Sequence, residues 1–176
     1  MSDSMQEKIR LMKGDITQLQ VDAIVNAANS SLLDGSGVNG AIHAAAGPEL
    51  LDECKELGDC APGQAKITKG YRLPAKFVIH AVGPMWRGGA KSEASLLADC
   101  YSSAMKLALK HNITTIAFPA ISCGIYGYPV RQASAIAVKE VSHFLEMHPE
   151  IEAVDFVCFT DECYAAYEQA MEMLNR

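Results

Sequence analysis

The stretch from residue 26 to residue 47 combines side-chain amides with closely spaced glycines, and it ends in a small-residue segment, 40–46, that is typical of a helix. The amides are those of Asn26, Asn29 and Asn39, and the closely spaced glycines are Gly35, Gly37 and Gly40. Glycines let backbone N–H groups approach a ligand closely, because no Cβ stands in the way. A helix that begins directly after them points its free N–H groups and the positive end of its dipole at the same place. The stretch is therefore predicted to bind phosphate through backbone amides.

A second glycine-containing loop, 122–127, lies between the apolar segment 114–119 and a helical segment, 130–147. Ligands of open α/β sheets bind beyond the carboxyl ends of the strands, so two such loops could hold a diphosphate from both sides. The simpler alternative is that both loops are ordinary turns between a strand and a helix.

Residues 35–40 also match the GxGxxG pattern of dinucleotide-binding enzymes. In those enzymes the pattern lies directly between strand and helix. Here residues 26–34 intervene, and the chain leaves no room for a separate catalytic domain. A small nicotinamide-dependent reductase is therefore a remote alternative.

Composition sets the broad class of protein. The chain has 176 residues, 49% of them hydrophobic and 20% charged, which predicts one globular domain over 1–176 with a core of about 8–174. A net charge of −6 argues against a nucleic-acid-binding surface. No segment resembles a signal peptide or a membrane span, and the six scattered cysteines are typical of reduced thiols, so we expect a cytoplasmic protein. Their spacing predicts no metal site.

Hydrophobic periodicity predicts alternating strands and helices. The strands are expected at 8–13, 21–25, 65–69, 76–82, 114–119 and 154–159, and the helices at 40–46, 48–57, 93–111, 130–147 and 162–174. Such alternation predicts a layered α/β domain with a largely parallel, buried sheet.

Several motifs together resemble the macrodomain family, and more narrowly its MacroD-type branch, which includes bacterial O-acetyl-ADP-ribose deacetylases. The motifs lie at 14–17, 26–29, 35–43, 78–84 and 119–129. The resemblance implies a three-layer α/β/α fold with a mixed, largely parallel sheet. It also implies that the chain binds ADP-ribose or its O-acetyl or protein-linked derivatives, and hydrolyses the ester-linked ones without a cofactor.

The resemblance assigns ligand contacts residue by residue. Asp15 would accept a hydrogen bond from the adenine amino group, with Ile16 beside the ring and Phe159 packed on it. Without the family, Asp15 could equally be a turn or capping residue, and Phe159 would be predicted to lie in the core. The diphosphate would lie between two sets of backbone groups. These belong to Gly37 and Val38 on one side and to Ser122, Cys123, Gly124, Ile125 and Tyr126 on the other.

Asn29, Asn39 and His43 would form the catalytic region, with Asn29 bonded to the hydroxyls of the distal ribose and Tyr126 packed against that ribose. His43 lies four residues after Asn39, so the two side chains can share one face of a helix. Asn26 is expected to order the loop by bonding neighbouring backbone. On sequence alone, His43 could instead be a packing residue and Tyr126 a turn residue, and His80 is expected to be a core histidine.

The chain departs from the hydrolytic family pattern, which has three consecutive glycines followed by Val-Asp-Gly. Ser36 replaces the middle glycine, which would cost about 1 kcal/mol or more if its φ were positive. Asn39 replaces the catalytic aspartate, and an amide has no basic site for taking a proton from water. Ala44 replaces a larger polar residue. Two functions remain besides the remote reductase: an ADP-ribose ester hydrolase, of weak or normal activity, or a module that binds ADP-ribose without turnover.

Overall fold

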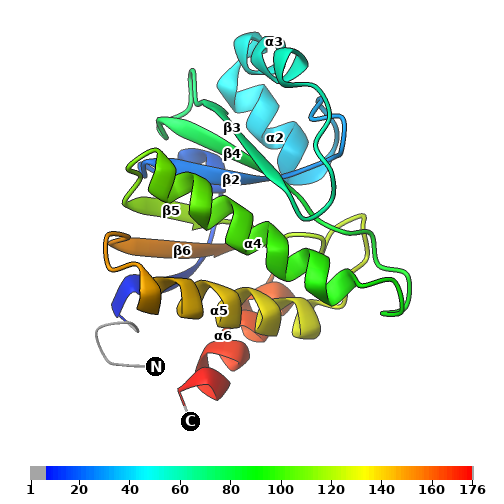
Figure 1. Cartoon of the computed structure of the whole chain (residues 1–176), viewed down its shortest axis with the longest axis vertical. Coiled ribbons are helices and arrows are strands. Elements are labelled where there is room, and N and C mark those ends of the chain that lie inside the picture. Colours follow the sequence, from blue (N-terminus) through cyan, green and yellow to red (C-terminus); the bar gives the residue numbers. More distant parts are fainter. Residues whose placement is uncertain (1–6, 176) are drawn as a thin grey trace.

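A six-stranded mixed sheet organises the chain in the computed structural model, which describes residues 7–175 (Figure 1). In the order in which they lie side by side, the strands are β1 (Ile9–Lys13), β6 (Ala153–Cys158), β5 (Thr115–Phe118), β2 (Ala23–Ala28), β4 (Phe77–Val82) and β3 (Ala65–Lys69). Only β3 pairs antiparallel with its neighbour among these strands. The predicted mixed, largely parallel sheet is therefore confirmed.

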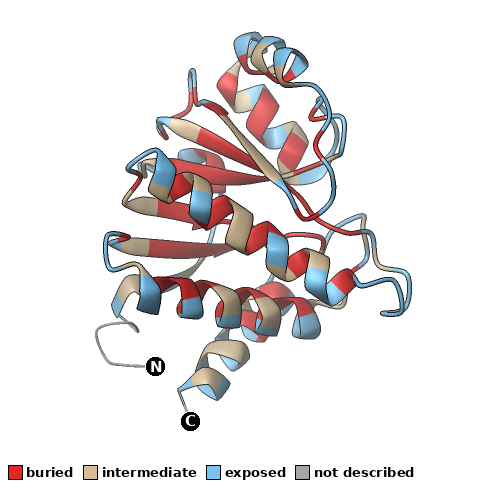
Figure 2. Ribbon diagram, viewed as in Figure 1, coloured by how far each residue is buried: buried red, intermediate tan, exposed pale blue. Residues whose placement is uncertain are grey.

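Helices cover both faces of the sheet and complete three layers. They are α2 (Gly37–Ala46), α3 (Pro48–Leu57), α4 (Glu93–Lys110), α5 (Val130–Met147) and α6 (Asp161–Leu174), together with the short 3-10 helix η1 (Ile16–Gln18). Side chains from β2 alternate between two cores: Val25 belongs to the core that includes residues of α4, α5 and α6, and Ile24 to the core that includes residues of α2 and α3. Because both faces are covered, the central strands are buried along most of their length (Figure 2).

Several predicted boundaries are correct, and those of β2 and α2, on either side of residues 29–36, are not. Helices α3 and α5 and strand β3 have the predicted limits. Strand β2 continues to Ala28, so Asn26 lies inside the sheet and not in a loop. Helix α2 begins at Gly37, three residues earlier than predicted. Strand β6 ends at Cys158, which leaves Phe159 outside it with 85% of its surface exposed; its prediction as a core residue was wrong.

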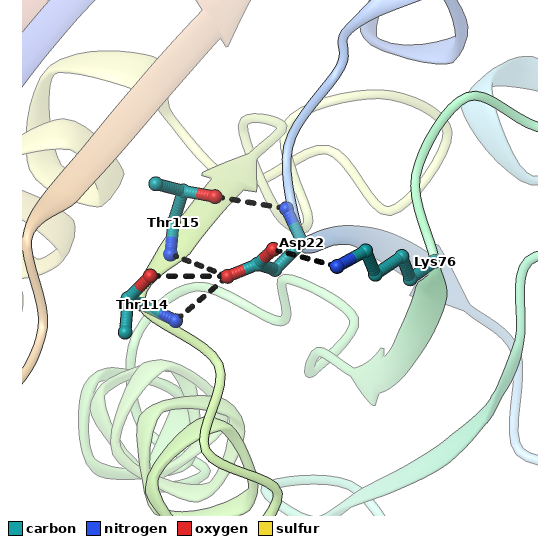
Figure 3. A network of polar contacts seen from close by, with 4 residues as sticks. All are labelled: Asp22, Lys76, Thr114 and Thr115. Atoms are coloured by element: carbon teal, nitrogen blue, oxygen red, sulfur yellow. Dashed lines mark hydrogen bonds and ion pairs between the residues drawn. The ribbon is translucent and has the colours of Figure 1, made fainter.

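A polar network joins three strands at the edge where they begin (Figure 3). Asp22 Oδ2 accepts hydrogen bonds from the backbone N–H of Thr114 at 3.0 Å and of Thr115 at 3.3 Å, and from Thr114 Oγ1 at 3.1 Å. The Asp22 N–H donates to Thr115 Oγ1 at 2.8 Å, and Lys76 Nζ lies 3.9 Å from Asp22 Oδ1. The Thr114 N–H is the largest cause of a lowered pKa for Asp22. This network fixes β2 against β5 and the start of β4.

We expect Asp22→Ala to lower the free energy of unfolding by about 1–2 kcal/mol at pH 7, since charge-assisted hydrogen bonds to a partly exposed carboxylate are lost. The folded-state pKa lies below the ordinary value of 3.8. The carboxylate therefore stabilises the fold fully above that value and stops doing so as the pH falls through the folded pKa. Urea unfolding at pH 7 and pH 3 measures both effects. A difference between native protein and variant that is as large at pH 3 as at pH 7 would contradict the assignment.

The described part of the chain also bears on the expectations from composition. No helix within residues 7–175 is both long enough and apolar enough to cross a membrane. All six cysteines are free thiols. In the same range, no three His, Cys, Asp or Glu side chains are grouped so that they could hold a metal ion.

Candidate functional site

Four parallel neighbours, β1, β6, β5 and β2, end at one edge of the sheet, the right-hand edge in Figure 1. Each is followed by predicted site residues: Asp15 after β1, Phe159 after β6, Ser122 after β5 and Asn29 after β2. The parallel register brings these residues to a common edge although they are far apart in the sequence. We call the segments 29–36 and 119–129 the first and second loop.

A chain of side-chain hydrogen bonds runs from the middle of the sheet to the first loop. Asn26 is fully buried, and its Nδ2 donates to Asn39 Oδ1 at 2.7 Å and contacts His80 Nδ1 at 3.1 Å. Asn39 Nδ2 in turn donates to the carbonyl oxygen of Leu33 at 3.0 Å. Asn26 thus orders the loop through the side chain of Asn39, and the expectation that it would bond neighbouring backbone was wrong.

The same contacts set the proton positions on His80. An amide nitrogen can only donate, so Nδ1 of His80 must accept and Nε2 must carry the hydrogen. Nε2 lies 2.9 Å from Thr68 Oγ1, which donates onward to the carbonyl of Lys69. Burial lowers the pKa of His80 to about 3, with the nearby His43 as the second cause, so the ring is neutral near pH 7. A neutral His80 therefore fixes the orientation of the Asn26 amide.

The start of α2 departs from the sequence prediction in a way that removes strain. Ser36 has φ −108° and is extended, so the expected cost of a positive φ is not incurred; the left-handed residue is Gly37, at φ 62°. Ser36 makes no side-chain capping hydrogen bond, and Gly37 and Val38 stand in the uncapped first turn. Gly40 lies so close to the first loop that a Cβ there would be 2.4 Å from the carbonyl oxygen of Gly35. Position 40 therefore needs glycine, because a larger residue there would clash with the backbone of the first loop.

His43 lies one helical turn after Asn39, and both are only 5% exposed. Burial is the main cause of a lowered pKa for His43, and the charge of Asp34 opposes it, so the imidazole is neutral near pH 7. Neither ring nitrogen of His43 has a hydrogen-bond partner among residues 7–175, and the same holds for Asn26 Oδ1 and Ser122 Oγ. Buried polar atoms in proteins are usually bonded, so each of these atoms is a candidate for bonding a polar ligand or water.

The second loop has a compact backbone. Ser122 is buried and left-handed at φ 68°, and its carbonyl accepts from the N–H of Tyr128 at 2.9 Å. The N–H of Gly127 donates to the carbonyl of Gly124 at 3.0 Å, while Ile125 is 83% exposed. Burial raises the pKa of Cys123 to about 12, so this thiol stays protonated. The second loop ends at residue 129 and α5 begins at Val130, as predicted.

The remaining predicted residues flank these loops. Asp15 caps η1, with Oδ1 accepting from the N–H of Thr17 at 2.9 Å and from its Oγ1 at 2.7 Å. The other oxygen of Asp15 has no partner in the described chain. Ile16 beside it is buried, whereas Phe159 is exposed. Asn29 is half-buried and donates to the carbonyl of Leu33 at 3.1 Å, so Leu33 accepts from both Asn29 and Asn39.

Sequence reasoning missed three participants: His80, Thr68 and the carbonyl group of Leu33. His80 is buried as expected, but it also orients Asn26. A signal for the contact between Asn26 and His80 lies in the strand pairing. Asn26 of β2 pairs with His80 of β4, and His80 pairs with Lys66 of β3, which is two residues before Thr68. A polar residue in the same position on neighbouring strands could have indicated the contact.

Two surface pockets differ in their relation to these residues. One of about 370 Å³ lies on α5 near the end of α6 and contains none of the predicted site residues. The other, of about 300 Å³, includes Tyr126 of the second loop and Ser30 of the first. Only the second pocket is therefore connected to the candidate site.

Comparison with known proteins gives consistent results. Residues 25–137 match the Macro domain family model. The chain is 61% identical over 163 residues to a macro domain-containing protein of Chlorobaculum tepidum, covering 93% of this chain and 95% of that one. It is 51% identical over 171 residues to the O-acetyl-ADP-ribose deacetylase of Escherichia coli K12, covering 95% and 97%.

Solved structures agree with these relatives. A variant of the Oceanobacillus iheyensis macrodomain with ADPR superposes with a TM-score of 0.90 at 41% identity, covering 94% of this chain and 92% of that one. The Trypanosoma brucei macrodomain in complex with ADP-ribose superposes with a TM-score of 0.91 at 44% identity, covering 97% and 72%.

Proposed function

Because the chain belongs to the macro domain family, we propose that it binds ADP-ribose at the edge where β1, β6, β5 and β2 end. The diphosphate lies between the uncapped first turn of α2, at Gly37 and Val38, and the backbone of 122–126 in the second loop. Backbone N–H groups and the α2 dipole provide the positive potential that a chain of net charge −6 lacks overall. Solved relatives bound to ADPR and ADP-ribose support this assignment.

The same placement positions the two ends of the ligand, adenine and the distal ribose. Adenine packs on the exposed ring of Phe159 beside Ile16, and its amino group donates to the free oxygen of Asp15. The distal ribose lies against Asn29 and Tyr126. A ligand in this position gives a reason for Phe159 to be 85% exposed in a chain whose other phenylalanines are largely buried.

The observation that carries the proposal is the set of buried polar atoms without partners. In the described chain they belong to Asn26, His43 and Ser122, which come from β2, α2 and the second loop. Leaving such atoms unpaired costs about 1–3 kcal/mol each, which is recovered when a polar ligand or water bonds to them. These atoms come from three separate elements, and each can bond a polar ligand or water.

We further propose that the chain hydrolyses O-acetyl-ADP-ribose or ester-linked protein mono-ADP-ribose with reduced activity. The relatives named O-acetyl-ADP-ribose deacetylase support the reaction class. The reduction follows from Asn39: its Oδ1 accepts from Asn26, and its Nδ2 donates to Leu33. The amide oxygen keeps a second lone pair that can accept a hydrogen bond from water, but an amide has no basic site, so Asn39 cannot act as a general base. The same fact favours the second candidate, a binding module without turnover.

A nicotinamide-dependent reductase is not proposed. The glycines at 35–40 stand in the first loop and the first turn of α2, separated from β2 by residues 29–34, and the matched relatives are macro domain proteins.

Val38→Pro tests the backbone contacts, because proline is tolerated in the first turn of a helix but has no N–H. We expect native protein to bind ADP-ribose with a micromolar dissociation constant, and Val38→Pro to bind about tenfold more weakly through loss of one hydrogen bond to a charged group. Val38→Ala keeps the N–H and is the matched control. Calorimetry measures both, with melting temperatures to confirm folding. Equal affinities of the proline and alanine variants, or no binding by native protein at millimolar ligand, would contradict the proposal.

A further inference from the structure

A pocket of about 300 Å³ adjoins the proposed ADP-ribose site without belonging to it. Its lining shares only Tyr126 with the predicted contacts, and it includes Ser30, the residue after Asn29. Asn29 and Tyr126 are the two residues assigned to the distal ribose. The pocket therefore adjoins the residues assigned to the distal ribose, since it includes Tyr126 and the residue that follows Asn29.

The pocket carries two cationic side chains in a chain that is acidic overall. Arg87 and Lys91 are both exposed, and neither makes an ion pair within residues 7–175. Apolar residues complete the lining, among them Pro62, Pro84 and Leu96. This combination suits a peptide segment that has both apolar and negatively charged side chains.

The loop that carries these cations is held in place. Glu93 is 1% exposed, and its carboxylate accepts the backbone N–H groups of Arg87 at 2.9 Å, Gly89 at 2.8 Å and Lys91. Burial raises the pKa of Glu93, but these N–H donors outweigh it, so the net shift is downward and the carboxylate is ionised. The N–H dipoles of this loop compensate the negative charge of Glu93. The N–H of Trp86 donates to the carbonyl of Tyr126 at 2.9 Å, which joins the loop to the proposed diphosphate site.

We propose that this pocket receives an acidic peptide segment flanking an ADP-ribosylated side chain, with Arg87 and Lys91 recognising its carboxylates. The inference rests on the proposed function, and it extends that function from the nucleotide to the modified protein. An acetyl group is far smaller than the pocket and carries no charge, so O-acetyl-ADP-ribose would leave both cations unused. The pocket thus favours modified protein over the free acetyl ester as the substrate class.

Binding of synthetic conjugates tests this without depending on turnover. Two peptides carry ADP-ribose through a stable linkage, one with flanking glutamates and the other with glutamines at the same positions. We expect native protein at low salt to bind the glutamate conjugate about fivefold more tightly, as expected for two exposed ion pairs, with the preference declining at high salt. Arg87→Ala with Lys91→Ala should abolish the preference, and Arg87→Glu with Lys91→Glu should invert it.

The controls separate this inference from the proposed function. Arg131→Ala with Lys106→Ala removes two exposed cations from α5 and α4 and should leave the preference unchanged. Free ADP-ribose should bind equally to native protein and to both Arg87/Lys91 variants. Equal binding of the two conjugates by native protein, or a preference that survives Arg87→Glu with Lys91→Glu, overturns the pocket assignment while ADP-ribose binding stands. Failure of native protein to bind free ADP-ribose overturns both.

Discussion

Replacement of Asn39 by aspartate is expected to raise kcat for O-acetyl-ADP-ribose hydrolysis by about 10²–10⁴-fold, the usual contribution of a general base. The amide of Asn39 uses its oxygen on Asn26 and one N–H on Leu33. A carboxylate would keep the first contact but present its second oxygen to the carbonyl of Leu33, which cannot donate. That oxygen is then free to take a proton from water.

The pH profile of Asn39→Asp adds a second readout. Because two oxygens would face each other near Leu33, the introduced carboxyl should have a raised pKa, and the gain in rate should grow as the pH rises through it. Mass spectrometry must accompany the assay, since the sequence Asn39-Gly40 is prone to deamidation, which would regenerate an acid in native protein. Equal rates of native protein and variant would show that this position does not set the chemistry, as expected if a ligand phosphate activates the water.

Phe159→Ala should weaken ADP-ribose binding about tenfold to hundredfold, the range found when an aromatic ring that stacks on a base is removed. Phe159 is 85% exposed, so its removal leaves no cavity and should change the free energy of unfolding little. Phe159→Ala should therefore lower the affinity without lowering the stability, whereas a substitution in the core would lower the stability.

The matched measurements use ADP and ribose 5-phosphate. The loss on Phe159→Ala should be the same for ADP and ADP-ribose, and ribose 5-phosphate should be unaffected because it has no adenine. Phe159→Tyr keeps a ring and should retain most of the affinity. An alanine variant that binds ADP as tightly as native protein would remove Phe159 from the site.

The fold was predictable where one segment's own pattern determines its structure. Helix α5 and strand β3 have continuous periodicity, and their limits were predicted correctly. Strand β2 was predicted to end at Val25 because the apolar run ends there. It continues to Ala28, and the buried amide of Asn26 is stable in the strand because its partners Asn39 and His80 come from α2 and β4. Such partners are set by tertiary structure and cannot be read from the residues beside Asn26.

The site residues divide in the same way, into those that a local pattern indicates and those that it does not. The two loops and their glycines were predicted as a binding site from spacing alone, while the individual roles of Asp15, Asn29 and Phe159 were assigned by resemblance and stay predictions. Phe159 follows an apolar strand, so local pattern predicted burial; it is exposed because β6 ends one residue earlier. The extended φ of Ser36 could not be predicted either, since the strain depended on which residue of the turn is left-handed.

We propose that backbone N–H groups, and not cationic side chains, hold the diphosphate. A crystal structure of the native chain with ADP-ribose would show which groups contact the phosphates. We expect phosphate oxygens within about 2.7–3.2 Å of backbone nitrogens in the first turn of α2 and in residues 122–126. A diphosphate bound elsewhere, or held there by lysine and arginine side chains while those N–H groups bond other partners, would contradict it.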